Sequence, residues 1–415
     1  MSSILVLVGL LVLAYLGSIL VGGRAIRGYG LPSGAEWVLL GVVLGPHLLG
    51  VVERSTLALL EPVAQVALAW LALVIGVDYG FVGQRRISLR RLFAGVVLAL
   101  GSGTGVAAAF AVYAQTFTGL RGHDLMVTCI GVGAVSCETT RYAVRWVVER
   151  YAAEGPLSSL VADMSEADDV IPLVAITLAF ALVPTPGLKL SLPFWGVALS
   201  ILGAGVLLGA LASALLRVEA RVTQTWGIVL GAALFGIGLA TRLASSALGL
   251  LFALGITLSW LAGRRHELRA MLERTEHSVL LPVLVLAGAY VDFGAPSHLV
   301  PLVAVVLSAR LAVKWTSGAL LRLSRGGKRA GPLLGFGLLS SGGVAMGFGL
   351  AFAFRFPGEV GQTVLVVAAV VTLFGELVGP TSLRYALGRA GEIEAAPTSS
   401  RLGRRTSSRP PPRTA

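Results

Sequence analysis

The residues most able to do chemistry form an acidic cluster in the stretch VADMSEADDVIPLV, which contains Asp163, Ser165, Glu166, Asp168 and Asp169. On a helix, adjacent aspartates project about 100° apart, so both can face one cavity. Ser165 lies one turn before Asp169, on the same face. In surroundings of low dielectric constant, two such carboxylates should titrate as a coupled pair. Their oxygen atoms suit a proton or a hard cation such as Na⁺, K⁺ or Li⁺, and give little basis for a transition metal.

Two other stretches combine small and hydroxyl residues in a way that favours interrupted helices. GVGAVSCETTRYAVRW contains Ser136, Glu138 and Thr139, and GLLSSGGVAMGFG contains the run Ser340, Ser341, Gly342 and Gly343. Their separation along the chain predicts an inverted repeat whose two broken helices cross near the middle of a membrane. Two simpler interpretations remain open: the glycines only allow close helix packing, and Glu138 is a structural partner of Arg141 or Arg145.

The segment VVLSARLAVKWTSGAL carries two cations, Arg310 and Lys314, inside an apolar stretch. A cation at that depth needs an anionic partner, and Asp168 is the partner we predict for Arg310. Lys314 lies one turn away and is expected to extend its ammonium group to the membrane interface.

These residues must be positioned by membrane helices, because the composition is far from that of a soluble domain. The 415 residues are 55% hydrophobic and 13% charged, with a mean hydropathy of +0.84. Soluble domains average about 25% charged residues. Apolar runs of spanning length recur throughout the chain and predict about thirteen spans. They cover residues 3–22, 35–51, 57–82, 92–117, 125–147, 157–183, 192–216, 225–241, 244–263, 277–293, 296–321, 331–354 and 360–387.

The charge on the short links alternates along the whole chain. One set of links is rich in arginine, around residues 24–27, 85–91, 150, 217–221, 264–274 and 322–329. The other set carries only Arg54, Arg121, Lys189, Arg242 and Arg355. By the positive-inside rule, the N-terminus lies outside and the C-terminus in the cytoplasm, which requires an odd number of spans. The formal net charge of +12 therefore reflects topology and gives no reason to expect nucleic-acid binding.

The domain organisation that follows is a membrane domain over residues 1–390 and a disordered, basic cytoplasmic tail over 391–415. Cys129 and Cys137 form no CxxC motif, the histidines form no ligand cluster, and GSGTG at 101–105 lacks the context of a phosphate loop. We expect no cofactor, and a membrane enzyme is the least favoured class because no catalytic constellation is found.

At this level of detail the chain resembles the cation:proton antiporter superfamily, specifically the sodium/hydrogen exchanger family and its two-aspartate, Kef/NapA-like branch. The resemblance covers about residues 1–390. It rests on VLLGVVLGPHLLG, ALVIGVDYGF, SEADDVIPLV and FGELVGPTSLRYALGRAGE, on their order, and on the two interrupted segments.

The resemblance implies interleaved dimerisation and mobile core subdomains, a homodimer in the cell (inner) membrane, and an elevator-like mechanism. It implies that Asp169 is the essential acid that binds cation and proton, that Asp168 occupies the position associated with electrogenic transport, and that Ser165 is a hydroxyl ligand. Arg310 matches a basic residue that pairs with the core acids. The segment Ser136–Cys137–Glu138–Thr139–Thr140 departs from the usual pattern, so the ligand roles of Glu138 and Thr139 and the ion selectivity remain open.

These observations predict an all-α secondary antiporter that exchanges Na⁺ or K⁺ for H⁺ by alternating access, with Asp168 and Asp169 holding the cation. One alternative is a carrier for an anion or organic solute on the same fold, suggested by Glu138, Arg141 and Arg145. Another is a membrane sensor or scaffold that transports nothing.

Overall fold

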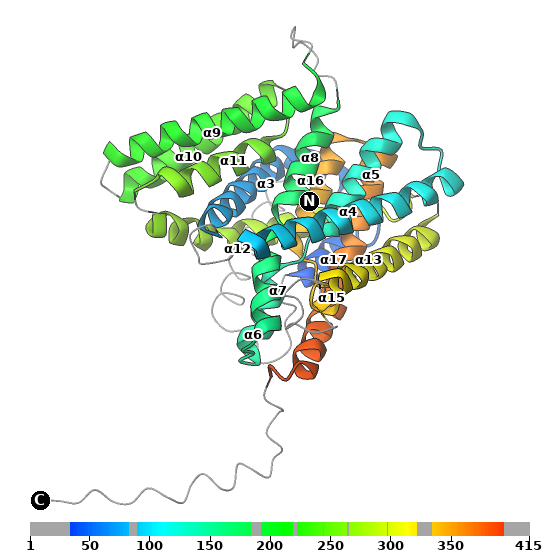
Figure 1. Cartoon of the computed structure of the whole chain (residues 1–415). Helices are drawn as coiled ribbons and strands as arrows, with labels where there is room; N and C mark the ends of the chain where they lie inside the picture. The colour runs from blue at the N-terminus through cyan, green and yellow to red at the C-terminus, as the bar shows by residue number, and fades with distance from the viewer. Residues whose placement is uncertain are drawn as a thin grey trace, which may run out of the picture.

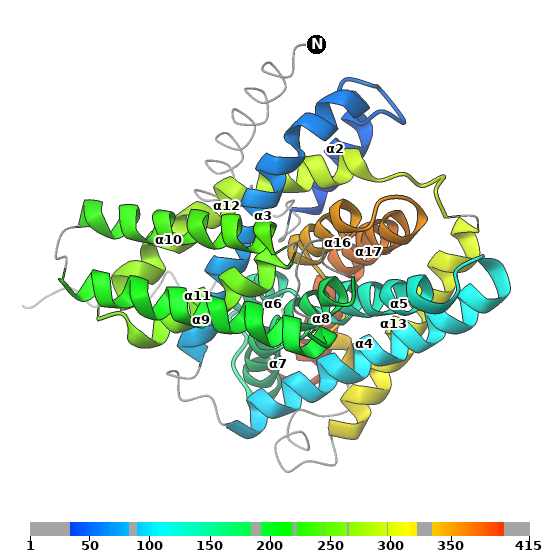
Figure 2. The ribbon, with the colours of Figure 1, turned by 90° about the horizontal axis from the view of Figure 1, so that it is seen from above.

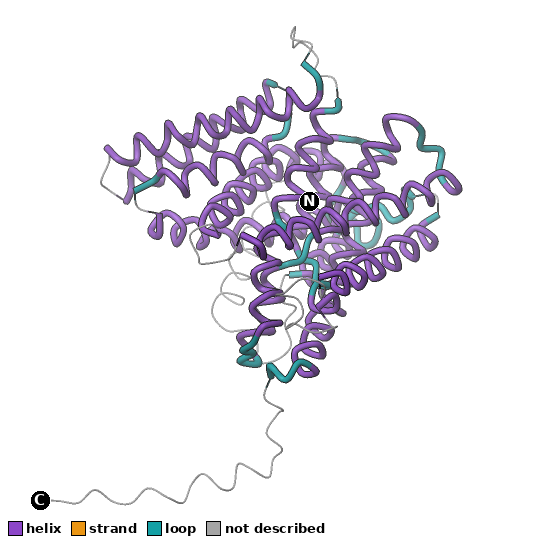
Figure 3. Tube along the Cα trace, viewed as in Figure 1, coloured by secondary structure: helices purple, strands orange, loops and turns teal. Residues whose placement is uncertain are grey.

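The computed structural model of the chain describes residues 34–82, 89–183, 192–218, 222–243, 245–263, 265–296, 298–321 and 334–393. Within these ranges every regular element is a helix and no strand occurs (Figure 3). The helices are α2 (Ala35–Leu44), α3 (Arg54–Val82), α4 (Leu89–Phe117), α5 (Gly122–Cys137), α6 (Arg141–Arg150), α7 (Pro156–Ala167), α8 (Val170–Ala181), α9 (Phe194–Val218), α10 (Val222–Arg242), α11 (Ala247–Leu261), α12 (Arg265–Tyr290), α13 (Leu299–Leu321), α15 (Leu334–Gly337), α16 (Gly343–Arg355) and α17 (Glu359–Arg389).

The apolar helices agree with the predicted spans. Among the described residues, α3, α4, α9, α10, α13 and α17 are each long and apolar enough to cross a membrane, and α2, α11 and α16 are shorter apolar helices. Helices suit this setting because they satisfy all their backbone groups internally. The predicted span over 3–22 lies outside the described residues, as does the tail from residue 394 onward.

Three predicted spans are divided into two helices. Span 125–147 forms α5 and α6, span 157–183 forms α7 and α8, and span 331–354 forms α15 and α16. The first and third divisions agree with the predicted interruptions, but the second was expected to be one continuous helix. Pro172 accounts for it, because its nitrogen carries no hydrogen to donate to the carbonyl of Asp168 four residues earlier. Ile171 N–H donates to that carbonyl instead, at 3.2 Å, which tightens the turn between the two helices.

The helices pack in two groups. In the first helix group, α3 packs against α11 and α12, α11 against α9 and α10, and α2 against α12. In the second helix group, α4 packs against α5, α7 and α13, while α17 packs against α5, α15 and α16. Both views show the separation: α9, α10 and α11 lie on one side of the molecule and α4, α5 and α13 on the other (Figures 1 and 2). Helices α6, α7 and α8 belong to the second group and meet the first at α3, α9 and α11.

Hydrogen bonds connect the C-terminal end of α17 to the N-terminal end of α7. Glu392, just after α17, is 9% exposed, and its carboxylate accepts hydrogen bonds from the backbone N–H groups of Leu157 and Ser158 at 2.6 and 2.7 Å. These N–H groups belong to the first turn of α7, where an anion is stabilised by otherwise unpaired donors and by the helix dipole. Helix α7, which leads into the acid pair, is thereby fixed to the end of α17.

Candidate functional site

Two extended segments cross within the second helix group. Residues 138–140 join α5 to α6, and residues 338–342 join α15 to α16. Thr140 N–H donates to the carbonyl of Ser340 at 3.3 Å, and the Thr139 hydroxyl donates to the carbonyl of Leu338 at 3.4 Å. The predicted pair of crossed, interrupted helices is therefore confirmed. Within it, Ser136 is still helical, because α5 continues to Cys137, and Gly343 is the first residue of α16.

The carbonyl ends of α5 and α15 meet two cations from α13. The Arg310 guanidinium donates to the carbonyls of Ser136, Glu138, Leu339 and Ser340. The Lys314 ammonium donates to the Cys137 carbonyl at 2.8 Å and to the Thr139 hydroxyl at 2.7 Å. Carbonyl groups at the end of a helix carry partial negative charge and lack partners within the helix. Arg310 and Lys314 supply both the charge and the hydrogen bonds that these ends require.

Two predictions for these cations are wrong. Arg310 forms no ion pair with Asp168 in the described part of the chain, because its donors are directed at backbone carbonyls of the crossing. Lys314 does not extend to the membrane interface: it is 3% exposed and held at the crossing. Both residues still compensate negative charge, but it is the partial charge of the carbonyl ends of α5 and α15 and not the charge of Asp168.

Glu138 is a negative charge at the N-terminal end of a helix, whereas Arg310 and Lys314 are positive charges at carbonyl ends. Its Oε2 atom accepts hydrogen bonds from the Ser341 hydroxyl at 3.0 Å and from the Gly342 N–H at 3.2 Å, immediately before α16. A carboxylate at a helix N-terminus is stabilised by the dipole and by unpaired N–H groups. The interpretation of Glu138 as a partner of Arg141 or Arg145 is wrong, since those arginines pair with other acids. The crossing thus balances two carbonyl ends with two cations and one N-terminal end with an acid.

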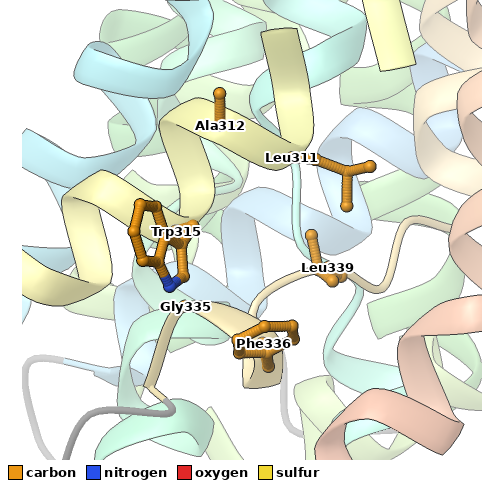
Figure 4. A pocket seen from close by; sticks show the side chains of 6 residues that line it. All are labelled: Leu311, Ala312, Trp315, Gly335, Phe336 and Leu339. Carbon is orange, nitrogen blue, oxygen red and sulfur yellow. The ribbon is translucent and has the colours of Figure 1, made fainter. Parts of the chain in front are cut away.

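An apolar pocket of about 280 Å³ lies between α13 and the second interrupted segment. Figure 4 shows the residues that line it, with Leu311, Ala312 and Trp315 on α13 and Phe336 and Leu339 on the second interrupted segment. No charged side chain lines this pocket. This pocket is therefore unsuited to binding a bare ion.

The acid pair lies at the junction of α7 and α8, where Asp168 ends one helix and Asp169 precedes the next. Each residue is 4% exposed. The Asp168 Oδ1 atom and the hydroxyls of Ser136 and Ser340 are buried without a hydrogen-bond partner. The Ser165 hydroxyl, predicted as a ligand, donates to the Ala162 carbonyl at 3.0 Å. Buried oxygen atoms that lack partners are uncommon and call for an explanation such as a bound ion, water or proton.

The partner of Asp169 is Arg141, the first residue of α6. The Arg141 Nη1 atom lies 4.0 Å from Asp169 Oδ2 and 2.9 Å from Asp78 Oδ2. Its Nη2 atom lies 3.1 Å from Glu276 Oε1. Asp78 belongs to α3 and Glu276 to α12, so these two ion pairs join the two helix groups.

The two additional acids of the cluster have partners of their own. Asp163 pairs with Arg91 of α4 at 2.7 Å, and Glu166 pairs with Arg145 of α6 at 2.5 Å. The arginine side chains are about 40% exposed in both pairs, so water screens these interactions. Asp163 and Glu166 therefore differ from the buried pair Asp168 and Asp169 in having partly exposed arginine partners. The spacing of the acids along the sequence could not show this difference.

The sequence interpretation missed Asp78, Glu276 and Arg269 as neighbours of the site. Glu276 fell one residue before the predicted span 277–293 and therefore looked like part of a link. Helix α12 in fact begins at Arg265, which carries Arg269 and Glu276 into the protein. Asp78 lies within the quoted ALVIGVDYGF motif, and an acid near the end of an apolar run was the one available signal for it.

No group of three or more His, Cys, Asp and Glu side chains arranged to hold a metal ion occurs among the described residues. The oxygen donors near the acid pair are instead carboxylates, hydroxyls and backbone carbonyls. Such a donor set fits a transported monovalent cation better than a resident transition metal.

A buried acid pair beside two crossed, interrupted helices is an arrangement that secondary transporters built from broken helices also have. The particular fold is that of the sodium/proton antiporters. The chain is similar to a structure of the sodium proton antiporter MjNhaP1 from Methanocaldococcus jannaschii at pH 8, with a TM-score of 0.69 and 14% identity over 94% of this chain and 98% of that one. A structure of the same protein from electron microscopy gives a TM-score of 0.67 and 15% identity over 94% and 99% of the two chains. No protein-family model and no curated protein sequence matches the chain.

Proposed function

We propose that the chain is a secondary antiporter that exchanges a monovalent cation, Na⁺ or K⁺, for H⁺ by alternating access. The observation that carries the proposal is the buried acid pair, Asp168 and Asp169, at a helix junction beside the two crossed segments. The cation is the cargo and Asp169 is its main ligand, with Asp168 and nearby hydroxyl and carbonyl oxygens completing the site.

Burial gives the exchange its physical basis. An ionised carboxylate inside a membrane protein is costly unless a positive charge neutralises it. A proton and a metal cation each meet that need, and both cannot occupy the same oxygen atoms. Proton release therefore favours cation binding and cation release favours proton binding, which couples the two opposed fluxes.

The fold likeness supports this proposal. The two similar structures are of a protein named as a sodium proton antiporter, and their likeness extends over nearly the whole of both chains. We further propose that the second helix group is the mobile core, that the first forms the dimer interface, and that transport is electrogenic because both acids titrate. In the orientation that the arginine-rich links predict, the N-terminus lies outside the inner membrane and the C-terminus in the cytoplasm.

The partners of the buried and half-buried arginines count against an anion carrier. That alternative rested on Arg141 and Arg145, whose guanidinium groups could bind a substrate carboxylate. Arg141 is paired with Asp78 and Glu276, and Arg145 with Glu166. These groups already bind carboxylates of the chain itself.

The test is proton movement in proteoliposomes after pulses of Na⁺, K⁺, Li⁺ or an organic anion, with the membrane potential monitored. The antiporter account predicts proton movement in response to Na⁺ or K⁺ and none that depends on the organic anion. A response to the organic anion without any response to the three cations would favour the anion carrier. Absence of flux under every gradient would favour the sensor or scaffold and overturn the proposal.

A further inference from the structure

Arg141 is placed where local helix energetics disfavour it. It is the first residue of α6, directly after the extended segment 138–140. The first turn of a helix carries partial positive charge, so a cation is disfavoured there. It is also only 7% exposed, which removes most of the stabilisation that water would provide. This cost is offset by the three acids around it, together with contacts to the hydroxyl and ring of Tyr142.

Those acids come from both helix groups. Asp78 of α3 and Glu276 of α12 belong to the first group, at 2.9 and 3.1 Å from the Arg141 nitrogens. Asp169 belongs to the second group, as Arg141 itself does, and lies farther away at 4.0 Å. Any displacement of one group relative to the other must change the first two ion pairs, whereas the pairing of Arg141 with Asp169 can persist.

Asp78 of the first group keeps a cationic partner when Arg141 departs. Asp78 also accepts a hydrogen bond from Arg269 Nε at 3.0 Å, and Arg269 is held by Glu273 at 2.8 Å. The Asp78 carboxylate is thus fixed by its own helix group. Arg141 is the member of the network that can change partners without leaving Asp78 as an uncompensated buried charge.

The space beside this network is small. A cavity of only about 10 Å³ lies between Asp78, Arg141, Arg145, Glu166, Asp169 and Arg269. That is about the smallest volume able to hold one water molecule. The Arg141 guanidinium lines this cavity together with Asp169 and is shared between Asp169 and the two acids of the first group.

We propose that Arg141 is a tethered counter-cation that gates Asp169: it competes with the transported cation for that carboxylate, and Asp78 and Glu276 hold it when the cation is bound. This inference rests on the proposed antiport function. In this proposal Arg141 sets the apparent affinity of Asp169 for the cation. Asp78 and Glu276 act indirectly, because they determine where Arg141 lies.

Removing Arg141, which competes with the cation, and removing Glu276, which holds Arg141 away from Asp169, should change the apparent cation affinity in opposite directions. Arg141→Gln removes the competing charge, so the cation concentration for half-maximal proton movement should fall. Glu276→Gln releases Arg141 toward Asp169, so that concentration should rise. We expect each shift to be about fivefold or more, at the lower end of usual coupling factors between sites. A purely structural role predicts loss of maximal rate in both variants, with no opposed shift.

The double variant Arg141→Gln, Glu276→Gln protects the test against misfolding, because it removes both members of an ion pair and leaves neither charge buried alone. It should show the increased affinity of Arg141→Gln. Arg91→Gln is the matched control, since it breaks an arginine–aspartate pair with Asp163 of α7 that does not reach Asp169. Its half-maximal concentration should equal that of the unaltered protein.

The experiment measures proton movement in proteoliposomes over a series of Na⁺ and K⁺ concentrations for the unaltered chain and these variants. Opposed shifts in the two single variants, with the double variant following Arg141→Gln, support the gate. Exchange by the unaltered chain with unchanged or parallel shifts overturns the gate and leaves the antiport proposal standing. No response of the unaltered chain to Na⁺, K⁺ or Li⁺ overturns the antiport proposal and the gate with it.

Discussion

The side chains around the crossing divide into those that balance the helix ends and those that stay available to a transported ion. Arg310, Lys314 and Glu138 each use their charge on backbone groups of the interrupted helices. Asp168 keeps one carboxylate oxygen without a hydrogen-bond partner. This division explains why cations so near the acid pair need not block it. The cation nearest to Asp169 is instead Arg141, at 4.0 Å.

The charge of Asp168 is expected to determine the electrical behaviour of transport. In Asp168→Asn, one of the two titrating groups is lost while Asp169 still binds cation or proton, so exchange should continue with one charge fewer per cycle. We expect cation-dependent proton movement whose rate no longer responds to an imposed membrane potential. Flux measurements in proteoliposomes at several potentials test this, and an unchanged voltage response would contradict the role assigned to Asp168.

The charge of Glu138 is expected to stabilise the crossing. Glu138→Gln keeps the shape of the side chain but removes the negative charge before α16 and near Arg310. A hydrogen bond to a charged buried group contributes roughly 1.5–3 kcal/mol, so the free energy of unfolding should fall by about that amount. Thermal unfolding in detergent measures the loss, with Glu149→Gln, an exposed position near the end of α6, as the control. Equal stability of the two variants would refute this account of Glu138.

Sequence patterns predicted the crossing because its causes are local. Runs of serine and glycine at 340–343 and the polar run at 136–140 lie inside apolar stretches, and both produce the expected breaks. The break at the acid pair was also local, since Pro172 removes the donor for the Asp168 carbonyl, but the apolar pattern concealed it. The pairing of Arg141 with Glu276 could not be predicted in this way, because the two residues are 135 positions apart and no periodicity relates them.

Helix α17 approaches the second extended segment closely at Gly375, so a larger residue there should displace the segment. A Cβ atom added to Gly375 would lie 2.5 Å from the backbone nitrogen of Ser341, so alanine there must displace the segment. Overpacking of this kind typically costs about 1–3 kcal/mol. We expect Gly375→Ala to unfold at lower temperature and to lose most of its exchange activity, because the crossing moves relative to the acid pair.

Gly388→Ala is the control on the same helix. No atom lies within 4 Å of a Cβ added at Gly388, and alanine favours a helix over glycine by roughly 0.5–1 kcal/mol. This variant should be as stable as the unaltered chain or slightly more so, with full activity. Similar losses in both variants would show that close packing at Gly375 is not what positions the segment.

At the scale of the whole molecule, the proposed ion site lies in the second helix group, and two acids that pair with Arg141, Asp78 and Glu276, belong to the first. The ion pairs of Arg141 with Asp78 and Glu276 cross the boundary between the groups, so a relative movement of the groups must change them. The predicted all-α fold of the sodium/proton antiporters is confirmed by the described helices and by the similar structures. The assignment of mobile core and dimer interface stays a prediction, since the fold likeness alone does not test it.

The central claim is that Asp169 carries cation and proton in turn. The most direct measurement compares the unaltered chain with Asp169→Asn in proteoliposomes, following internal pH after Na⁺ and K⁺ pulses. The account predicts cation-dependent proton movement by the unaltered chain and its abolition in the variant, with the variant still folded by thermal unfolding. Proton movement by Asp169→Asn at the rate of the unaltered chain would contradict it.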